Sequence, residues 1–469
     1  MKINIGFRFL KGMALLFILA ILISFGKPIN AKISNIQSSD TADSLIYLPL
    51  SMKNYPWRTI FGTQTQNLGD ETFSSLAVDA GLDWVRLDAF NWSKIEPQRT
   101  DPPTYKWNSV DQESLKAAKD NGIEAIAIVR GTPDWAQKYP GISCGPINNS
   151  ELDEFASFLN TLVKRYSVPP YSIKYWELGN EPDVDPALVS PSSVFGCWGD
   201  DGDRHYGGRY YADMLKVAYP AIKSADPEAK VLIGGLLLDC DPSKENSCKS
   251  GKFLDGILEN DGGQFFDILS FHGYPHFGAS SKWDHRGGVV LGKVDYIRQK
   301  LANKNLEKPI FHTEGSLLCH PADIANCEPP GTDFYEAQAD YLPTLFVTNW
   351  VEGIEATIWY QFEGPGWRFG GLLDEDQNPK PVYDTLQFMT QQLGSATYIG
   401  RVFESTPVAG YKFKTFAKEI WVLWSPDGSL QSVTLPSSYD HIFDKYGDEI
   451  SLTNNQLEVG SPVYVEFNK

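Results

Sequence analysis

The sequence lacks an excess of positive charge and has no conspicuous run of basic residues. Its 469 residues include 41 Lys and Arg against 59 Asp and Glu, which gives a formal net charge of −18. A protein that binds nucleic acid needs clustered basic side chains to neutralise phosphates, and an anionic membrane surface repels a negative protein. We therefore expect no nucleic-acid partner, whereas neutral polymers such as polysaccharides meet no opposing charge.

Short motifs for metals and nucleotides are also scarce. No CxxC pair occurs among the cysteines, and we predict that the chain binds no metal ion. No Gly-rich phosphate loop follows the first expected strand, which argues against a dinucleotide-binding open sheet. We therefore expect neither a metal nor an organic cofactor.

The N-terminal segment contains one apolar run, MALLFILAILISF, from Met13 to Phe25. A basic stretch precedes it, and small and polar residues follow it up to Ala31. Its length of about 13 residues is short for a membrane span. The pattern predicts a secretory signal peptide over residues 1–31, a linker over residues 32–56, and a secreted protein. Retention of the segment as a membrane anchor is the alternative.

Cysteine is infrequent, and its even number of six suits an oxidising compartment. The expected pairs, two of which close short loops, are Cys240–Cys248, Cys319–Cys327 and Cys144–Cys197. Buried free thiols are the alternative to these disulfides.

Apolar strand patterns alternate with amphipathic helix patterns through the domain that we expect over residues 57–393. The strand patterns cover residues 59–66, 84–90, 124–130, 173–181, 230–238, 266–274, 308–315 and 354–362. Helix patterns between them include Glu151–Tyr166, Gly208–Ala225 and Glu336–Glu352. Nearly continuous apolar strands require a parallel sheet that is covered on both faces, and closing eight of them leaves no exposed edge. The α/β pattern thus predicts a (β/α)8 TIM barrel, with an open doubly wound sheet as the rival.

The last segment, residues 394–469, changes character. Stretches such as YKFKTF, EIWVLWS and SPVYVEF alternate apolar and polar residues between Gly, Pro and Asn-Asn breaks. This pattern predicts a small antiparallel, β-sandwich-like accessory domain that packs on the barrel.

Two glutamates lie at the ends of the fourth and seventh expected strands. In YWELGNEPD, Glu177 lies inside the strand and Glu181 at its end, and Glu314 ends the strand in FHTEGS. Catalytic groups of such barrels lie at the carboxyl ends of the strands. Glycoside cleavage needs a carboxylic acid to protonate the leaving oxygen and a carboxylate to trap the sugar. A separation of about 5–5.5 Å permits retention, and one of about 6.5–9.5 Å admits water and gives inversion.

These features resemble the retaining glycoside hydrolases of clan A. The shared features are the eight strands, the Asn-Glu-Pro that ends strand four and the glutamate that ends strand seven. The C-terminal β domain is similar to the arrangement in family 39, which includes β-xylosidases and α-L-iduronidases, with family 5 cellulases as the near alternative. The resemblance covers Thr59 to Lys469 and implies Glu181 as acid/base and Glu314 as nucleophile. Strand three ends in VRGTPDW without the histidine of many family 5 members, which disfavours a cellulase.

The resemblance also implies further substrate contacts. Asn180 would donate a hydrogen bond to the sugar 2-hydroxyl, and Arg86 would keep the nucleophile ionised. His272 and Tyr274 match a His-x-Tyr pair whose tyrosine steadies the nucleophile. A structural ion pair for Arg86 and a core position for His272 are the alternatives.

Two tryptophans complete the expected site. Trp359 resembles the tryptophan that forms the floor under the reacting sugar, and Trp135 lies near a strand end, where sugar stacking is expected. Both would be core residues otherwise. The expected function is a secreted retaining glycosidase that acts on a polysaccharide or oligosaccharide. A non-catalytic polysaccharide-binding surface protein on a degenerate barrel, or a transglycosylating enzyme, is the alternative.

Overall fold

The computed structural model describes residues 59–193, 195–319, 327, 330–403, 407–452 and 454–468. The predicted signal peptide and linker, residues 1–31 and 32–56, lie outside these ranges. Residues 57–469 belong to one compact unit. Among the helices of the described ranges, none combines the length and the hydropathy that a membrane crossing requires.

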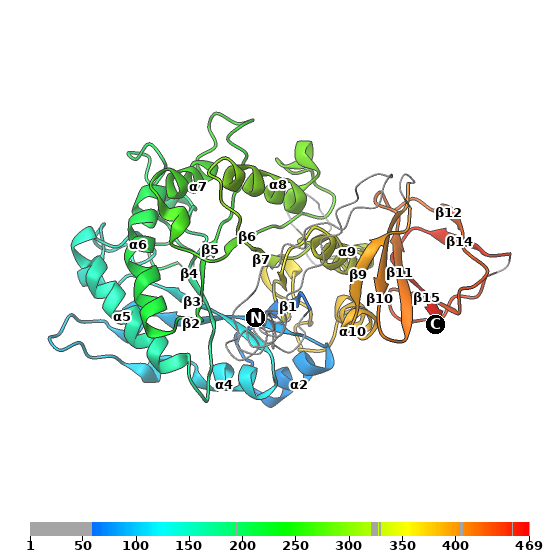
Figure 1. Ribbon diagram of the computed structural model, residues 1–469, viewed down its shortest axis with the longest axis horizontal. Coiled ribbons are helices and arrows are strands. Elements are labelled where there is room, and N and C mark those ends of the chain that lie inside the picture. The colour runs from blue at the N-terminus through cyan, green and yellow to red at the C-terminus, as the bar shows by residue number, and fades with distance from the viewer. Residues whose placement is uncertain are drawn as a thin grey trace, which may run out of the picture. The chain divides into compact units, whose positions relative to one another are not determined.

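Eight parallel strands form the centre of the fold (Figure 1). They are β1 (Phe61–Gln64), β2 (Trp84–Asn91), β3 (Glu124–Arg130), β4 (Tyr175–Asn180), β5 (Lys230–Gly235), β6 (Leu269–His272), β7 (Ile310–Gly315) and β8 (Ala356–Trp359). Their order is β5-β4-β3-β2-β1-β8-β7-β6, and parallel bridges from Leu232 to Ile268 and from Leu236 to Phe271 bring the outer two strands together. The predicted barrel is confirmed. Most strands end earlier than predicted, because their last residues leave the ladder and enter the loops.

Helices surround the strands, as α/β alternation requires (Figure 1). They are α2 (Glu71–Asp79), α3 (Trp92–Ile95), α4 (Gln112–Asp120), α5 (Leu152–Tyr166), α6 (Gly208–Ala225), α7 (Ser250–Glu259), α8 (Val289–Ala302), α9 (Thr332–Val351) and α10 (Pro381–Leu393). The three helices predicted from apolar spacing correspond to α5, α6 and α9.

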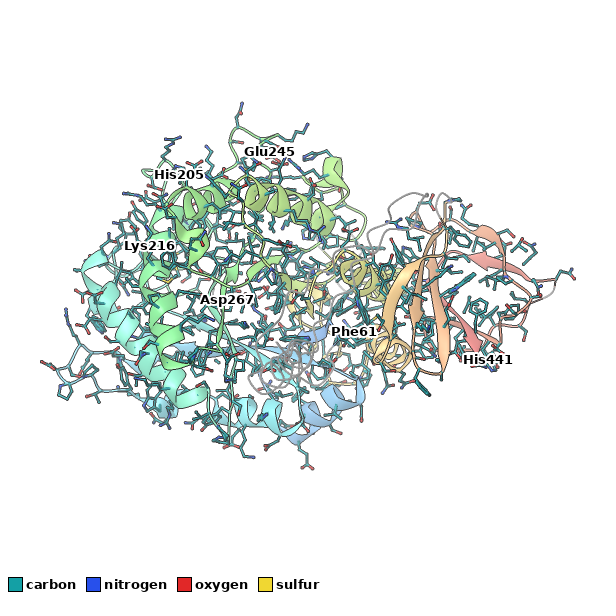
Figure 2. All side chains as sticks on the ribbon, in the orientation of Figure 1. Phe61, His205, Lys216, Glu245, Asp267 and His441 are labelled. Atoms are coloured by element: carbon teal, nitrogen blue, oxygen red, sulfur yellow. A yellow bond between two sulfur atoms is a disulfide. The ribbon has the colours of Figure 1, made fainter. Side chains whose placement is uncertain are left out.

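The barrel interior is apolar at the amino ends of the strands and polar at their carboxyl ends. Trp84 packs edge-on against Tyr175 and Phe311, with ring centroids 4.9 and 5.5 Å apart. Figure 2 shows that side chains fill the space between the strands. Among the described residues, this apolar layer fills the amino end of the barrel interior, and the polar side chains lie at the carboxyl end.

The C-terminal segment forms antiparallel sheets, as predicted. A five-stranded sheet contains β9 (Thr397–Arg401), β10 (Ala409–Lys414), β11 (Lys418–Trp424), β13 (His441–Asp444) and β15 (Val463–Asn468). A separate pair contains β12 (Gln431–Thr434) and β14 (Gln456–Val459). Apolar side chains from both sheets share one small core.

All three predicted disulfides are present, and each lies in loops at the carboxyl ends of barrel strands. Cys144–Cys197 joins the loops after β3 and β4, Cys240–Cys248 closes part of the loop after β5, and Cys319–Cys327 closes part of the loop after β7. In the chain-entropy model such closures stabilise a protein by about 2–4 kcal/mol each.

The β domain contacts the barrel through α9 and α10. Trp350 of α9 packs against Phe413 of β10, with ring centroids 5.2 Å apart. The Lys445 side chain is buried and its Nζ lies 2.9 Å from Glu336 Oε2 and 2.7 Å from Asp340 Oδ1, both on α9. A buried ammonium needs such partners, so Lys445 fastens the β domain to the barrel.

We predict that Lys445→Met reduces the free energy of unfolding by about 1.5–3 kcal/mol, because two charge-assisted hydrogen bonds are lost. Urea unfolding followed by tryptophan fluorescence measures the change. Lys414→Met is the matched control, since Lys414 is an exposed lysine of the same domain. Equal midpoints for the two variants would contradict the fastening role.

Candidate functional site

Glu181 and Glu314 enter the barrel mouth from β4 and β7. The backbone of Glu181 has a positive φ of 49°, a conformation that costs a residue other than glycine about 1–3 kcal/mol. The Glu181 N–H donates to Gly235 O at 3.0 Å, which holds this turn against β5. Irregular pairing between β6 and β7 places His272 opposite Glu314. The turn at Glu181 and the irregular pairing of β6 with β7 interrupt the regular alternation of side chains along the strands. Both interruptions lie where the candidate functional side chains are.

The structure brings the two predicted glutamates together. One oxygen of Glu181, one oxygen of Glu314 and one ring nitrogen of His272 all lie within 4.8 Å of one another. His272 Nδ1 is 2.7 Å from Glu181 Oε1 and 3.4 Å from Glu314 Oε2. Both residues are almost wholly buried: Glu181 is 3% exposed and Glu314 is 5% exposed.

Arg86 of β2 is a buried hub that joins four side chains. Its Nε donates to Glu177 Oε2 at 2.5 Å, and its Nη2 donates to Asn180 Oδ1 at 2.7 Å. Its Nη1 donates to Gln64 Oε1 at 2.6 Å and to Glu314 Oε1. Burial opposes its charge, but the carboxylates of Glu177 and Glu314 raise the pKa of Arg86 above its ordinary value. Arg86 thus stays a cation beside Glu314.

Glu177 is the structural counterion of this arginine. Besides Arg86, it accepts hydrogen bonds from Ser270 Oγ and Thr313 Oγ1, both at 3.0 Å. Glu177 is fully buried and does not line the cavity described below. The sequence placed it away from the cleft, but its counterion role depends on strands distant in the chain.

The two paired carboxyls have different surroundings. Burial raises the pKa of Glu181 well above its ordinary value, and the charges of Glu314 and Asp183 raise it further. Burial also raises the pKa of Glu314, but Arg86 and a hydrogen bond from Tyr274 OH oppose this effect. Glu181 is therefore the better proton donor, and Glu314 the better carboxylate.

His272 is neutral, and the side chains of Lys293 and Asp183 support the strand ends around it. Burial, together with the charges of Arg86 and Lys293, lowers the pKa of His272 well below its ordinary value. Lys293 of α8 is buried, and its Nζ donates to His272 O at 2.8 Å and to Leu237 O. Asp183 accepts the N–H groups of Leu237 and Leu238 at 2.9 and 2.8 Å. These contacts hold the ends of β4, β5 and β6 together.

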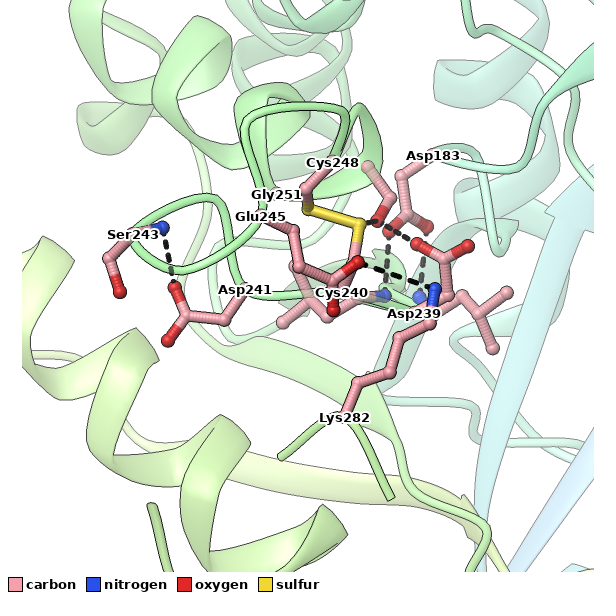
Figure 3. Close-up of a disulfide and its surroundings, with 12 residues drawn as sticks. Asp183, Asp239, Cys240, Asp241, Ser243, Glu245, Cys248, Gly251 and Lys282 are labelled. Atoms are coloured by element: carbon pink, nitrogen blue, oxygen red, sulfur yellow. Dashed lines mark hydrogen bonds and ion pairs between the residues drawn. A yellow bond between two sulfur atoms is a disulfide. The ribbon is translucent and has the colours of Figure 1, made fainter. Parts of the chain in front are cut away.

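Asp183 lies near the disulfide-closed part of the loop after β5. Figure 3 shows Asp183 together with Asp239, Lys282 and the Cys240–Cys248 disulfide. Burial raises the pKa of Asp183 to about 6, although two backbone N–H groups oppose the shift. This carboxylate is thus part of the support for the loop and not of the cavity lining.

A cavity of about 710 Å³ opens above the two glutamates. Its lining comprises Gln64, Gln66, Asp88, Ile128, Arg130, Asn180, Glu181, Val184, Leu188, Val189, Phe195, Leu237, Tyr274, Glu314, Tyr360, Trp367 and Arg368. Its volume is in the range of ordinary ligand sites. Four of the predicted site residues, Asn180, Glu181, Tyr274 and Glu314, line it directly, while Arg86 and His272 contact the glutamates from beneath.

Neither predicted tryptophan is part of this lining. Trp359 is fully buried, and its Nε1 donates to Gly370 O at 2.8 Å, which holds the indole under the loop after β8. Trp135 packs edge-on against Trp92 with ring centroids 5.3 Å apart, and its Nε1 donates to Glu96 O at 3.1 Å. The aromatic rings of the lining from β8 and its loop are those of Tyr360 and Trp367 instead.

Two lining residues that sequence analysis missed form an ion pair. Arg130 Nε donates to Asp88 Oδ1 at 2.6 Å, and its Nη2 contacts Asp88 Oδ2. A weak signal existed, because Asp88 follows Arg86 by two residues on β2 and Arg130 ends β3. Gln64 had no comparable signal, since its contact with Arg86 depends on strand pairing.

Within the described residues, one group of side chains is close enough together to bind a metal ion. It consists of Glu181, His272 and Glu314. Both oxygens of Glu314 already accept hydrogen bonds, one from Arg86 and one from Tyr274. A metal ion at this position would meet the guanidinium charge of Arg86. His276 follows His272 at the four-residue spacing of a metal-binding pair, but its Nε2 lies 3.2 Å from Arg368 Nη1. The donor set therefore fits proton transfer better than metal binding.

The loop after β8, which carries Trp367 and Arg368, rests on a buried lysine. Lys380 is 6% exposed; its Nζ donates to Phe369 O at 3.0 Å and lies 5.3 Å from the centroid of the Tyr335 ring. Burial lowers the pKa of Lys380 to about 7, against the opposing charge of Asp374. One wall of the cavity thus depends on an ammonium with few partners.

Comparison with known proteins identifies the fold. No known family profile matches the chain, and no curated protein matches it in sequence. Solved structures do match. A family 39 glycoside hydrolase from Bacteroides cellulosilyticus WH2 is 18% identical, with a TM-score of 0.64 over 88% of this chain and 81% of that one. A monomeric beta-xylosidase from Caulobacter crescentus CB15 is 15% identical, with a TM-score of 0.57 over 87% and 96%.

A third match is a GH30 endoxylanase from Clostridium papyrosolvens C71. It is 16% identical, with a TM-score of 0.55 over 88% of this chain and 97% of that one. The chain therefore has the fold of family 39 and family 30 glycoside hydrolases. This supports the resemblance to family 39 that the strand-end motifs indicated.

We predict that Lys380→Met flattens the dependence of stability on pH. An unfolded lysine keeps its proton up to about pH 10.4, but folded Lys380 loses it near pH 7. Between these values the unfolded state binds more protons, so wild-type stability rises with pH, by up to about 1.4 kcal/mol per pH unit for this group.

Urea midpoints measured between about pH 7 and pH 9.5 test this slope. The free energy of unfolding of the wild type minus that of Lys380→Met should fall as the pH falls towards 7. Folded Lys380 then takes up a proton, and the wild type bears the cost of the buried charge. Lys252→Met, at an exposed lysine of α7, is the control and should parallel the wild type. Parallel curves for Lys380→Met as well would refute the buried charge.

Proposed function

We propose that this chain is a retaining glycoside hydrolase that cleaves O-glycosidic bonds of a polysaccharide or oligosaccharide by double displacement. The observation that carries the proposal is the convergence of Glu181 and Glu314, with oxygens within 4.8 Å, beneath a cavity of about 710 Å³. The fold supports it, because its solved neighbours include a beta-xylosidase and an endoxylanase.

The first displacement uses both glutamates at once. Protonated Glu181 gives its proton to the glycosidic oxygen while a Glu314 oxygen attacks the anomeric carbon. The bond from that carbon to the leaving oxygen breaks, the alcohol departs, and a glycosyl ester of Glu314 remains. In the second displacement Glu181, now a carboxylate, takes a proton from water. The water oxygen then attacks the anomeric carbon and releases Glu314.

The contacts of each glutamate support this division of roles. Glu314 accepts hydrogen bonds from Arg86 and Tyr274, which favour its ionised form. Glu181 contacts His272, which its lowered pKa keeps neutral. A carboxyl without a cationic partner holds its proton longer, and this is what an acid catalyst requires.

The spacing supports retention of configuration. An inverting enzyme needs about 6.5–9.5 Å between its carboxyl groups to accommodate a water molecule. One oxygen of Glu181 and one of Glu314 lie within 4.8 Å of each other, which favours direct attack by Glu314 over attack by an intervening water. Asn180, whose carbonyl oxygen accepts from Arg86 Nη2, is oriented beside the acid and is proposed to contact the sugar 2-hydroxyl.

A non-catalytic polysaccharide-binding protein is the weaker candidate. Binding requires no pair of buried carboxyls, and burial of two of them has a desolvation cost that a purely binding role would not explain. We further propose that the protein is exported. Three disulfides in the described part of the chain support an oxidising compartment, and the apolar segment before Ala31 supports a cleaved signal.

We predict that Glu181→Gln lowers kcat/KM by about 10²–10⁴-fold and that Glu314→Gln lowers it at least as much. Release of nitrophenol from a panel of nitrophenyl glycosides measures the loss. Glu96→Gln is the matched control, because Glu96 is a buried carboxyl that binds Trp92 Nε1 outside the cavity. Wild-type activity in either cavity variant would remove that residue from the mechanism.

Azide rescue assigns the two roles separately. With Glu181→Ala, azide should yield a glycosyl azide of retained configuration, because it replaces water in the second displacement. With Glu314→Ala, azide should yield the inverted product, because it replaces the nucleophile. NMR of the products reads the configuration. The opposite pattern would exchange the two roles.

We also predict that Tyr274→Phe moves the acidic limb of the kcat/KM profile to higher pH. The Tyr274 hydroxyl lowers the pKa of Glu314, so its removal lets that pKa rise, and the nucleophile then ionises only at higher pH. Tyr360→Phe is the control, since Tyr360 lines the same cavity. Movement of the basic limb alone would show that Tyr274 acts on the acid instead.

A further inference from the structure

We infer that the bond cleaved joins an oligosaccharide to an apolar leaving group, an alkyl or aryl aglycone in place of a further sugar. This inference rests on the proposed hydrolase function and specifies its substrate. It comes from one wall of the cavity, here called the apolar wall. The members of this wall are Val184, Leu188, Val189, Phe195 and Leu237.

The apolar wall lies on the side of the cavity where the leaving group must bind. Glu181 has to reach the oxygen that joins sugar to leaving group, so the group beyond that oxygen lies next to the acid. Glu181 begins the loop after β4 that carries Leu188 and Phe195, and Leu237 follows β5, the neighbouring strand. The leaving group therefore meets this wall first.

The chemistry of the other walls is different. Gln64, Gln66, Asp88 and Arg130, which lie in or just after β1, β2 and β3, supply donors and acceptors that suit sugar hydroxyls. The cavity is thus divided between the apolar wall, which has no polar side chain, and the rest of the lining, where Ile128, Tyr274, Tyr360 and Trp367 stand among polar groups. A glycoside with an apolar aglycone has the same division.

Two side chains of the apolar wall are unusually exposed for apolar residues. Leu188 is 78% exposed and Phe195 is 37% exposed, although both line the cavity. Sugar rings stack on flat aromatic faces and need partners for their hydroxyls. This wall offers four aliphatic side chains and one phenyl ring, so a second sugar would lose hydration without gaining hydrogen bonds. An alkyl or aryl group would instead gain by covering these side chains.

The loop that carries the wall is held in place at both ends. Trp198 N–H donates to Pro182 O at 3.0 Å, and Gly196 N–H donates to Asn180 O. The Cys144–Cys197 disulfide ties the same segment to the loop after β3. The wall is therefore positioned before a ligand arrives, which lowers the entropic cost of binding.

The test uses probes that separate the sugar from the leaving group. A panel of pyranosyl fluorides, including xylosyl and glucosyl fluoride, reports the catalytic groups alone, because fluoride neither fills the leaving-group side nor needs an acid. Three 1-thioglycosides of the accepted sugar, which carry a methyl, a hexyl or a xylosyl group on the sulfur, are then compared. Each is tested as an inhibitor of the hydrolysis of the glycosyl fluoride. We expect the hexyl compound to inhibit at concentrations about 10- to 100-fold lower than the methyl compound.

The double variant Leu188→Ser/Phe195→Ser should bring the methyl and hexyl inhibition constants to within about threefold of each other. Its hydrolysis of the fluoride serves only as the assay in which both inhibition constants are measured. Leu430→Ser is the matched control, because Leu430 is 73% exposed and lies in the β domain. This control should keep the full preference for hexyl.

The outcomes separate this inference from the proposed function. Fluoride hydrolysis with equal inhibition by methyl and hexyl compounds, or with the xylosyl compound as the best inhibitor, overturns the apolar leaving group and leaves the hydrolase intact. A hexyl preference that survives the double variant places the aglycone elsewhere and also overturns the inference. Failure to hydrolyse any fluoride in the panel overturns the hydrolase, and the inference with it.

Discussion

The buried guanidinium of Arg86 is the interaction on which the rest of the site depends. A charge without solvent is tolerated only when partners surround it, and here they come from β1, β4 and β7. Glu177 neutralises Arg86 within the barrel, while Asn180 and Gln64 complete its hydrogen bonds. The remaining contact goes to Glu314. The hydrogen bonds of Arg86 therefore bring side chains of β1, β4 and β7 to one point.

The same arginine makes the two glutamates unequal. It contacts Glu314, which also accepts from Tyr274, whereas Glu181 contacts only the neutral ring of His272 among the hydrogen bonds described above. Burial raises the pKa of both carboxyls, and the asymmetric partners then separate them. Two identical side chains in one low-dielectric site thus have different partners, a difference that suits the proposed general acid and nucleophile.

The surrounding structure makes this arrangement rigid. Disulfides lie in the loops at the carboxyl ends of the strands, and Lys293 joins the ends of β5 and β6 through two carbonyl oxygens. Helices α9 and α10 carry the β domain on the side of the barrel, through contacts such as that of Trp350 with Phe413. The barrel mouth stays open between these supports, with polar groups on one side and aliphatic groups on the other.

The sequence by itself determined the eight strands, the two short-loop disulfide pairs and the two strand-end glutamates, because strand period, short cysteine spacing and Asn-Glu-Pro breaks are local signals. Only the tertiary structure decided which side chains surround the glutamates. Gln64 and Tyr360 reach the site through strand pairing, and Trp359, expected as its floor, is buried because its indole N–H binds a carbonyl of the next loop. Such contacts join residues far apart in the chain, and no local pattern encodes the loop conformation that creates them.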